Sequence, residues 1–180
     1  AQAAKDVIDL NIYSLHKASD ASTSFKTLFT TIPNKELILA KMDEAKSYSP
    51  EINNSPCGYF TGTVKCKGYT SPSQNLVDAF LTIDGKMIDE PGAVYDPQNP
   101  YTGRDPRLTN TIFYNGARWL NRGVETFEGG KDRANRGLPQ TQTGYYLRKF
   151  LGAFEKSTNF SNQHHTFMII RYAEILLNYV

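Results

Sequence analysis

The sequence predicts a mainly α-helical fold that carries a loop-rich region and one short β-hairpin. Three segments show helical patterns of apolar residues: Ala1–Leu15, Ser73–Leu81 and Arg171–Tyr179. Apolar residues three or four positions apart lie on one face of a helix, and another element must cover that face. An Asn-Gly pair between two β-prone runs predicts the hairpin.

The N-terminal segment is the first of these helices. Ala1, Ala4, Ile8, Ile12 and Leu15 follow helical spacing, and polar residues occupy most positions between them. A Ser- and Thr-rich loop is expected next. The short apolar run at 34–40 fits either a strand or a helix, because periodicity alone does not separate the two over so few residues.

Residues 47–72 are predicted to form a long irregular loop with room for a hairpin, because they are rich in Ser, Pro and Gly. This loop holds both cysteines of the chain, Cys57 and Cys66. They form a disulfide in an oxidising compartment or stay as two thiols in a reducing one, and the sequence leaves both alternatives open. Loops of this length inside a compact domain are often functional.

The second helix has a clear start signal. Ser71 is a suitable N-cap, Pro72 suits the first helical position, and Gln74 completes a capping box. The apolar positions that follow predict a helix that ends near Leu81.

The hairpin is predicted at residues 109–122. The runs 109–114 and 117–122 flank Asn115-Gly116, a pair that readily adopts the positive φ angles of a type I′ turn. The polar, Gly-rich stretch at 123–142 is expected to be a loop.

The composition is 39% apolar, 12% aromatic and 21% charged, as in an ordinary folded protein. A formal charge of +2 is too small to indicate nucleic acid or an anionic membrane as a partner. Residues 101–150 hold nine Lys or Arg against four Asp or Glu, which favours either an anionic ligand or a solvated surface. The chain begins without Met inside a helical pattern and stops within an apolar one, so we expect a piece of a longer protein.

Enzyme motifs are scarce: the sequence contains neither a P-loop nor a nucleophile elbow. His164 and His165 are adjacent, so on a strand they would face opposite sides and could not bind one metal ion. Asp105 is interpreted as the N-cap of a helical turn, and Asp43-Glu44 as a solvated face. A glycosidase needs two carboxyl groups about 5–10 Å apart, a separation that a sequence does not show. We therefore predict no catalytic residue, metal site or cofactor.

Aromatic residues make the better functional case. Trp119 is the only Trp, and it lies on the predicted hairpin with Tyr114, while Arg118 and Arg122 lie on the opposite face of its strand. An exposed Trp119 would stack on a sugar ring, and guanidinium groups would bind the sugar hydroxyls. The alternative is that Trp119 fills the core beneath the hairpin.

A second aromatic cluster lies in the long loop, where Tyr59, Phe60 and Tyr69 either bind a ligand or pack within the loop itself. The candidate ligand-binding residues are Trp119, Tyr114, Arg118, Tyr59 and Tyr69.

Several motifs in order resemble the SusD/RagB family. Residues 72–80 read PSQNLVDAF, and weaker agreement is found in NKELI at 34–38. The other three matching segments are DPRL at 105–108, TGYYLRKF at 143–150 and IRYAEILLNY at 170–179. The order and spacing of these motifs together are specific, and they cover most of residues 34–180.

The resemblance implies that residues 1–180 are part of a single SusD/RagB-like domain, truncated at both ends, with tetratricopeptide-like helix pairs. It implies a non-catalytic lipoprotein on the outer membrane of a Bacteroidetes-type bacterium, held by an N-terminal lipid anchor absent from this chain. Such a protein binds an oligosaccharide or polysaccharide and delivers it to a SusC-like TonB-dependent transporter. It also implies that Arg107, Arg148 and Arg171 tie loops to helices, with Glu174 as an acceptor. The rival hypotheses are a glycoside hydrolase with a carboxylate pair and a helical scaffold that binds only proteins.

Overall fold

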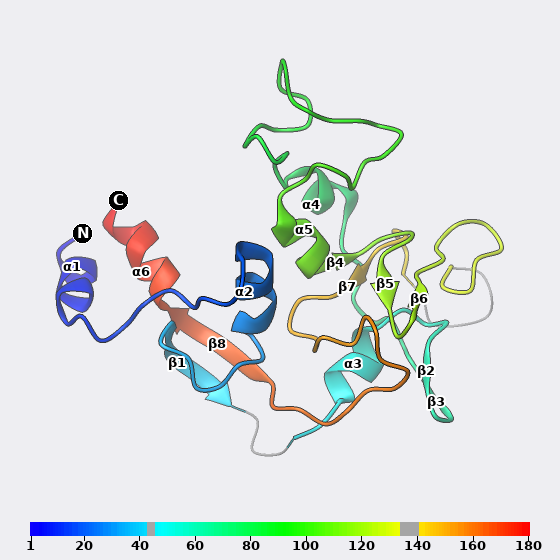
Figure 1. Ribbon diagram of the computed structural model, residues 1–180, viewed down its shortest axis with the longest axis horizontal. Coiled ribbons are helices and arrows are strands. Elements are labelled where there is room, and N and C mark those ends of the chain that lie inside the picture. Colours follow the sequence, from blue (N-terminus) through cyan, green and yellow to red (C-terminus); the bar gives the residue numbers. More distant parts are fainter. Residues whose placement is uncertain (43–45, 134–140) are drawn as a thin grey trace. The chain divides into compact units, whose positions relative to one another are not determined.

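A computed structural model describes residues 1–42, 46–133 and 141–180 of the chain (Figure 1). Asp43-Glu44, interpreted above as a solvated face, and part of the predicted 123–142 loop lie outside these described residues. The chain divides into two compact units. Unit 1 comprises Ala1–Ser47 and Asn162–Val180, and unit 2 comprises Tyr48–Ser161.

Unit 1 is built on a two-stranded antiparallel sheet that joins the two ends of the chain. Strand β1 (Leu37–Met42) pairs with β8 (Thr166–Arg171), as Figure 1 shows, so the ambiguous apolar run is a strand. Helix α1 (Gln2–Asp9) contacts α6 (Tyr172–Tyr179), which follows β8 directly.

Helix α1 is shorter than the sequence predicted. The prediction extended it to Leu15, but Asn11 adopts a positive φ of 52°, a conformation that ends a right-handed helix. Leu10, Ile12 and Leu15 are consequently exposed beyond the helix. A helix that the sequence analysis missed, α2 (Ala21–Leu28), occupies the expected Ser- and Thr-rich loop, because the Asp20 side chain accepts a hydrogen bond from the Thr23 amide as an N-cap.

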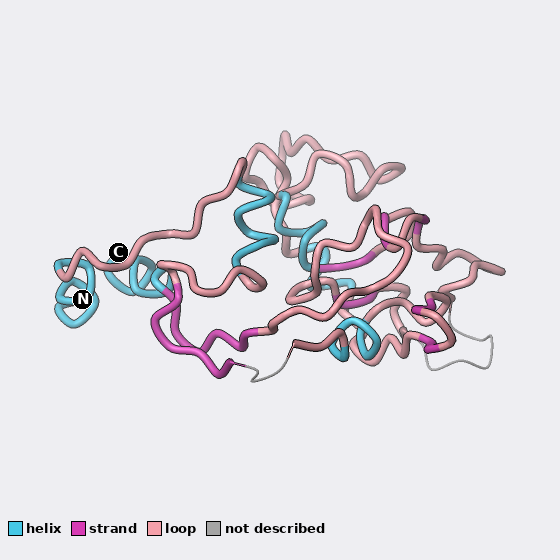
Figure 2. Tube along the Cα trace, turned by 60° about the horizontal axis from the view of Figure 1, so that its bottom comes forward, coloured by secondary structure: helices cyan, strands magenta, loops and turns pink. Residues whose placement is uncertain are grey.

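Unit 2 consists mostly of loops around short elements (Figure 2). Helix α3 (Ser49–Asn54) and the hairpin of β2 (Phe60–Thr61) and β3 (Val64–Lys65) lie in the segment predicted as a loop with room for a hairpin. Helix α4 (Gln74–Asp78) starts after Ser73, whose hydroxyl accepts from the Leu76 amide, instead of after Ser71. Helix α5 (Pro106–Thr111) is capped by Asp105, which confirms that interpretation.

The predicted 109–122 hairpin is wrong in its pairing. Residues 109–111 finish α5, and β4 (Ile112–Phe113) pairs with the distant β7 (Tyr146–Leu147). The hairpin instead joins β5 (Arg118–Trp119) to β6 (Arg122–Gly123). Its two-residue turn is Leu120-Asn121, with φ angles of 40° and 66°, so the type I′ geometry falls five residues after Asn115-Gly116.

Two apolar clusters form the core of unit 2. The larger one surrounds the fully buried Trp119 and includes Phe113, Tyr146, Phe154 and Phe160. The smaller one joins α4, α5 and Tyr145. Helices make up 24% and strands 16% of the described residues, so the mainly α-helical composition and the tetratricopeptide-like helix pairs are not confirmed.

Candidate functional site

The sugar-stacking surface predicted around Trp119 on the hairpin is not exposed in the structure. Trp119 is fully buried, and its indole N–H donates to Ser55 Oγ at 3.0 Å. Its ring packs against Phe113, Phe154 and Phe160. The core alternative for Trp119 is therefore the correct one, because a ligand cannot reach a ring enclosed on all sides.

The other predicted residues are not brought together. Tyr59 is buried, and desolvation raises the pKa of its phenol. Tyr114 is half-buried, with its ring stacked on Tyr101 at a centroid distance of 3.9 Å. Arg118 and Tyr69 are exposed, and 63% of Tyr69 is accessible. Of the five candidates, Tyr69 and Arg118 are the ones left on the surface of the fold.

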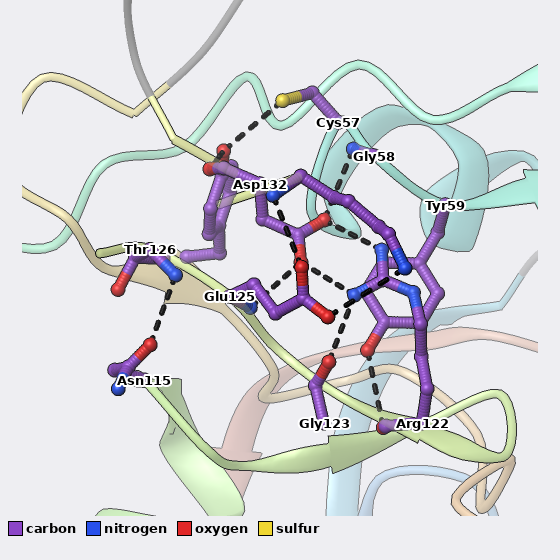
Figure 3. Close-up of polar contacts among 11 residues, drawn as sticks. Cys57, Gly58, Tyr59, Asn115, Arg122, Gly123, Glu125, Thr126 and Asp132 are labelled. Atoms are coloured by element: carbon purple, nitrogen blue, oxygen red, sulfur yellow. Dashed lines mark hydrogen bonds and ion pairs between the residues drawn. The ribbon is translucent and has the colours of Figure 1, made fainter. Parts of the chain in front are cut away.

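An ion pair between the partly exposed Arg122 and the buried Asp132 organises this part of unit 2 (Figure 3). Arg122 Nη2 donates to Asp132 Oδ1 at 2.9 Å, and Nη1 donates to Oδ2 at 2.7 Å. Two backbone amides complete the carboxylate shell: Gly58 N–H donates to Oδ1 at 3.1 Å and Glu125 N–H to Oδ2 at 2.8 Å. Asp132 is fully buried, and these four donors compensate the loss of water around its charge.

The same network includes Tyr59 and Tyr146. The Arg122 guanidinium lies 3.5 Å from the centre of the Tyr59 ring, and the Tyr59 hydroxyl donates to the Arg122 carbonyl at 3.2 Å. Tyr146 Oη donates to the Asp132 carbonyl at 2.6 Å and lies 3.3 Å from Cys57 Sγ. Both cysteines are buried free thiols in the structure. These contacts fix the 125–132 loop against the segment that precedes β2.

Beside this network lies a polar cleft of about 360 Å³. It is lined by Thr126, Arg133, Thr141, Gln142, Thr143 and Gly144. This cleft was not predicted, because four of its lining residues come from the polar 123–142 stretch, in which no motif was recognised, and Thr143 and Gly144 were noted only as the start of a family motif. The one available signal was the excess of positive charge over residues 101–150.

Hydrogen bonds hold both walls of the cleft in place. On one wall, the Thr126 amide donates to Asn115 Oδ1 at 3.0 Å (Figure 3). On the other wall, the Thr143 hydroxyl donates to the Pro72 carbonyl. The backbone N–H of Gln142 donates to Ser71 Oγ at 3.3 Å. Ser71 follows the exposed Tyr69 by two residues, so this aromatic residue belongs to a segment that touches the cleft wall.

The cleft offers groups that recognise a hydroxyl-rich molecule. Among the described residues, neither the Thr126 hydroxyl nor the Gln142 side-chain amide has a hydrogen-bond partner, and the Arg133 guanidinium has only a long ion pair with Glu128. Hydroxyl, amide and guanidinium groups together donate to and accept from sugar hydroxyls. Within the same described ranges, no cluster of three or more His, Cys, Asp or Glu side chains is placed to hold a metal ion. None of the described helices is long and apolar enough to span a membrane.

The fold is that of SusD-like proteins. A SusD-like protein from Bacteroides fragilis aligns with 98% of the chain at a TM-score of 0.72 and 23% identity. A SusD-like carbohydrate-binding protein from the same organism aligns with 99% of it at a TM-score of 0.67 and 24% identity. The chain spans 38% and 34% of the lengths of these two proteins.

The sequence itself matches the SusD family over residues 35–180, and the chain belongs to this family. The resemblance inferred from the motifs is thereby confirmed. A search of curated proteins finds no match.

Proposed function

We propose that this chain is part of a non-catalytic protein that binds an oligosaccharide or polysaccharide at the bacterial surface. The observation that carries the proposal is the polar cleft, where the Thr126 hydroxyl and the Gln142 side-chain amide have no hydrogen-bond partner among the described residues and suit a sugar. Membership of the SusD family supports the proposal, as does the likeness to a carbohydrate-binding member of known structure.

In the binding pose that we infer, Thr126 and Gln142 bond to sugar hydroxyls and Tyr69 offers an apolar ring face at the margin of the cleft. A sugar ring has an apolar C–H face and a polar rim, so it uses both kinds of surface. Buried groups do not contact the ligand in this scheme. Asp132 and Arg122 act as the support that holds the loop in shape.

The cellular location and the transporter partner that we propose follow from membership of the SusD family. Residues 1–180 form part of a single SusD-like domain, and the full-length protein is held on the outer membrane by a lipid anchor. It delivers the captured glycan to a SusC-like TonB-dependent transporter, with no nucleic acid as partner and no cofactor.

The test is a glycan-binding screen by affinity electrophoresis and calorimetry on the full-length protein. The variants Thr126→Ala and Gln142→Ala should each weaken binding about 2- to 10-fold, the value of one or two neutral hydrogen bonds. The matched controls Thr158→Ala and Gln98→Ala change exposed residues outside the cleft and should leave affinity unchanged.

Incubating the protein with glycans and then analysing the products distinguishes the proposed binding function from its rivals. Intact glycans are expected, whereas shortened products would favour a glycoside hydrolase. A protein that binds no glycan and still captures the transporter would favour a scaffold that binds only proteins.

A further inference from the structure

Three arginines of unit 2 already pair with carboxylates within the fold. Arg122 pairs with Asp132 and Arg148 with Glu155. Arg107 pairs with its helix cap, Asp105, through Nε at 2.9–3.0 Å. The guanidinium groups of these residues are therefore committed to protein carboxylates.

Arg133 differs from them. Among the described residues that line the cleft, Arg133 is the charged one, and its described carboxylate partner, Glu128, lies 3.9 Å away. The Glu128 side chain is 92% exposed, whereas the Arg133 side chain is 36% exposed. A solvent-exposed pair at this distance contributes little, because water screens it and two long side chains must be ordered to form it.

A ligand can therefore replace Glu128 at little cost. A guanidinium group binds a carboxylate through two parallel hydrogen bonds, and this geometry is stronger and more specific than a long pair with a solvent-exposed acid. The partly enclosed position of Arg133 also reduces the screening of a charge brought into the cleft.

We propose that the cleft selects acidic glycans, with Arg133 binding the carboxylate of a uronic acid residue. This inference rests on the proposed function, and it assigns the ligand class. Thr126 and Gln142 bind hydroxyls of the same sugar ring or of the neighbouring ring. The site therefore recognises a carboxylate next to sugar hydroxyl groups.

The experiment compares each acidic glycan with its own carboxyl methyl ester, which has the same backbone without the charge. The probes are oligogalacturonate, alginate oligosaccharides and hyaluronan oligosaccharides, measured by calorimetry on the full-length protein. At low salt, the acid of at least one pair should bind about 10- to 100-fold more tightly than its ester, the range for a charge-assisted hydrogen-bonded pair. Added salt should reduce this ratio.

Three variants sharpen the test. Arg133→Gln should bring the acid down to the affinity of its ester, while Glu128→Gln should raise the affinity for the acid about 2- to 5-fold by removing a competitor for the guanidinium. Lys156→Gln removes one positive charge at an exposed position outside the cleft and should change neither ligand.

The outcomes separate this inference from the proposed function. Equal affinity for acid and ester, or a preference that survives in Arg133→Gln, would overturn the assignment to acidic glycans and leave glycan binding in place. A protein that binds neither form of any probe and no neutral glycan would overturn both.

Discussion

Arg171 and Glu36, 135 residues apart in sequence, form an ion pair in which Arg171 Nη1 donates to Glu36 Oε1 at 2.7 Å. The other carboxylate oxygen accepts from the His16 amide at 2.7 Å, and the Glu36 carbonyl accepts from the Tyr172 amide. One buried acid thus ties the segment after α1 to the junction of β8 and α6. Glu174, which was expected to accept from an arginine, is exposed instead.

Glu36→Gln should therefore destabilise the protein by about 1–3 kcal/mol, because it removes the negative charge opposite the partly exposed Arg171. The matched variant Glu174→Gln should cost less than about 0.5 kcal/mol, as most exposed substitutions do. Urea denaturation of both variants checks this. Equal losses for the two would show that the expected partner, Glu174, has a larger role than its exposure indicates.

Asp132→Asn should cost about 2–4 kcal/mol, because it removes a charge and leaves buried donors without an acceptor. Asp89→Asn, at an exposed position, is the control and should have almost no effect. Thermal or urea denaturation is the measurement. A neutral result for Asp132→Asn would mean that the loop is held by its backbone bonds alone.

Trp119→Ala should cost about 3–5 kcal/mol, the range for removing a large aromatic residue from a packed core. Trp119→Phe keeps aromatic packing, loses the bond to Ser55 and should cost less than the alanine variant. If Trp119→Ala weakened glycan binding with stability unchanged, the ring would belong to the ligand surface.

Gly68→Ala should be more damaging than Gly85→Ala. Both residues have positive φ angles, 57° and 81°, so both substitutions incur the same kind of backbone strain, about 1–2 kcal/mol. Only at Gly68 would the added Cβ meet an obstacle, since the Tyr146 ring lies 2.3 Å from it. The difference between the two unfolding free energies isolates that collision, and no difference would argue against the close approach of Tyr146.

The two thiols should resist alkylation in the native state. Burial raises the pKa of Cys66 to about 12 and also raises that of Cys57. Because the unfolded thiols ionise near pH 9, their contribution to stability is complete below that pH and is lost as the pH rises toward the folded-state value. Peptide mapping after iodoacetamide treatment should find both labelled in urea and neither in buffer. Failure to label them in urea without reductant would show a disulfide.

Local signals in the sequence predicted some elements well. Asp105 before Pro106 marked a helix start, because an N-cap depends on neighbouring residues alone. Asn115-Gly116 was misleading for the opposite reason: β4 pairs with β7, more than 30 residues away, and distant pairing overrides turn preference. Among the site residues, the role of Asp132 could not be read from its polar loop, since one of its partners, Gly58, lies 74 residues away.

The Arg122–Asp132 pair stabilises the 125–132 loop, and neither of its two residues is among those that line the cleft. Stability resides in buried groups, whereas Thr126, Gln142 and Arg133 reach the cleft without belonging to that shell. We therefore expect substitutions at these three positions to alter the cleft more than the stability of the fold. Single mutations in the cleft lining can then accumulate at little cost in folding free energy.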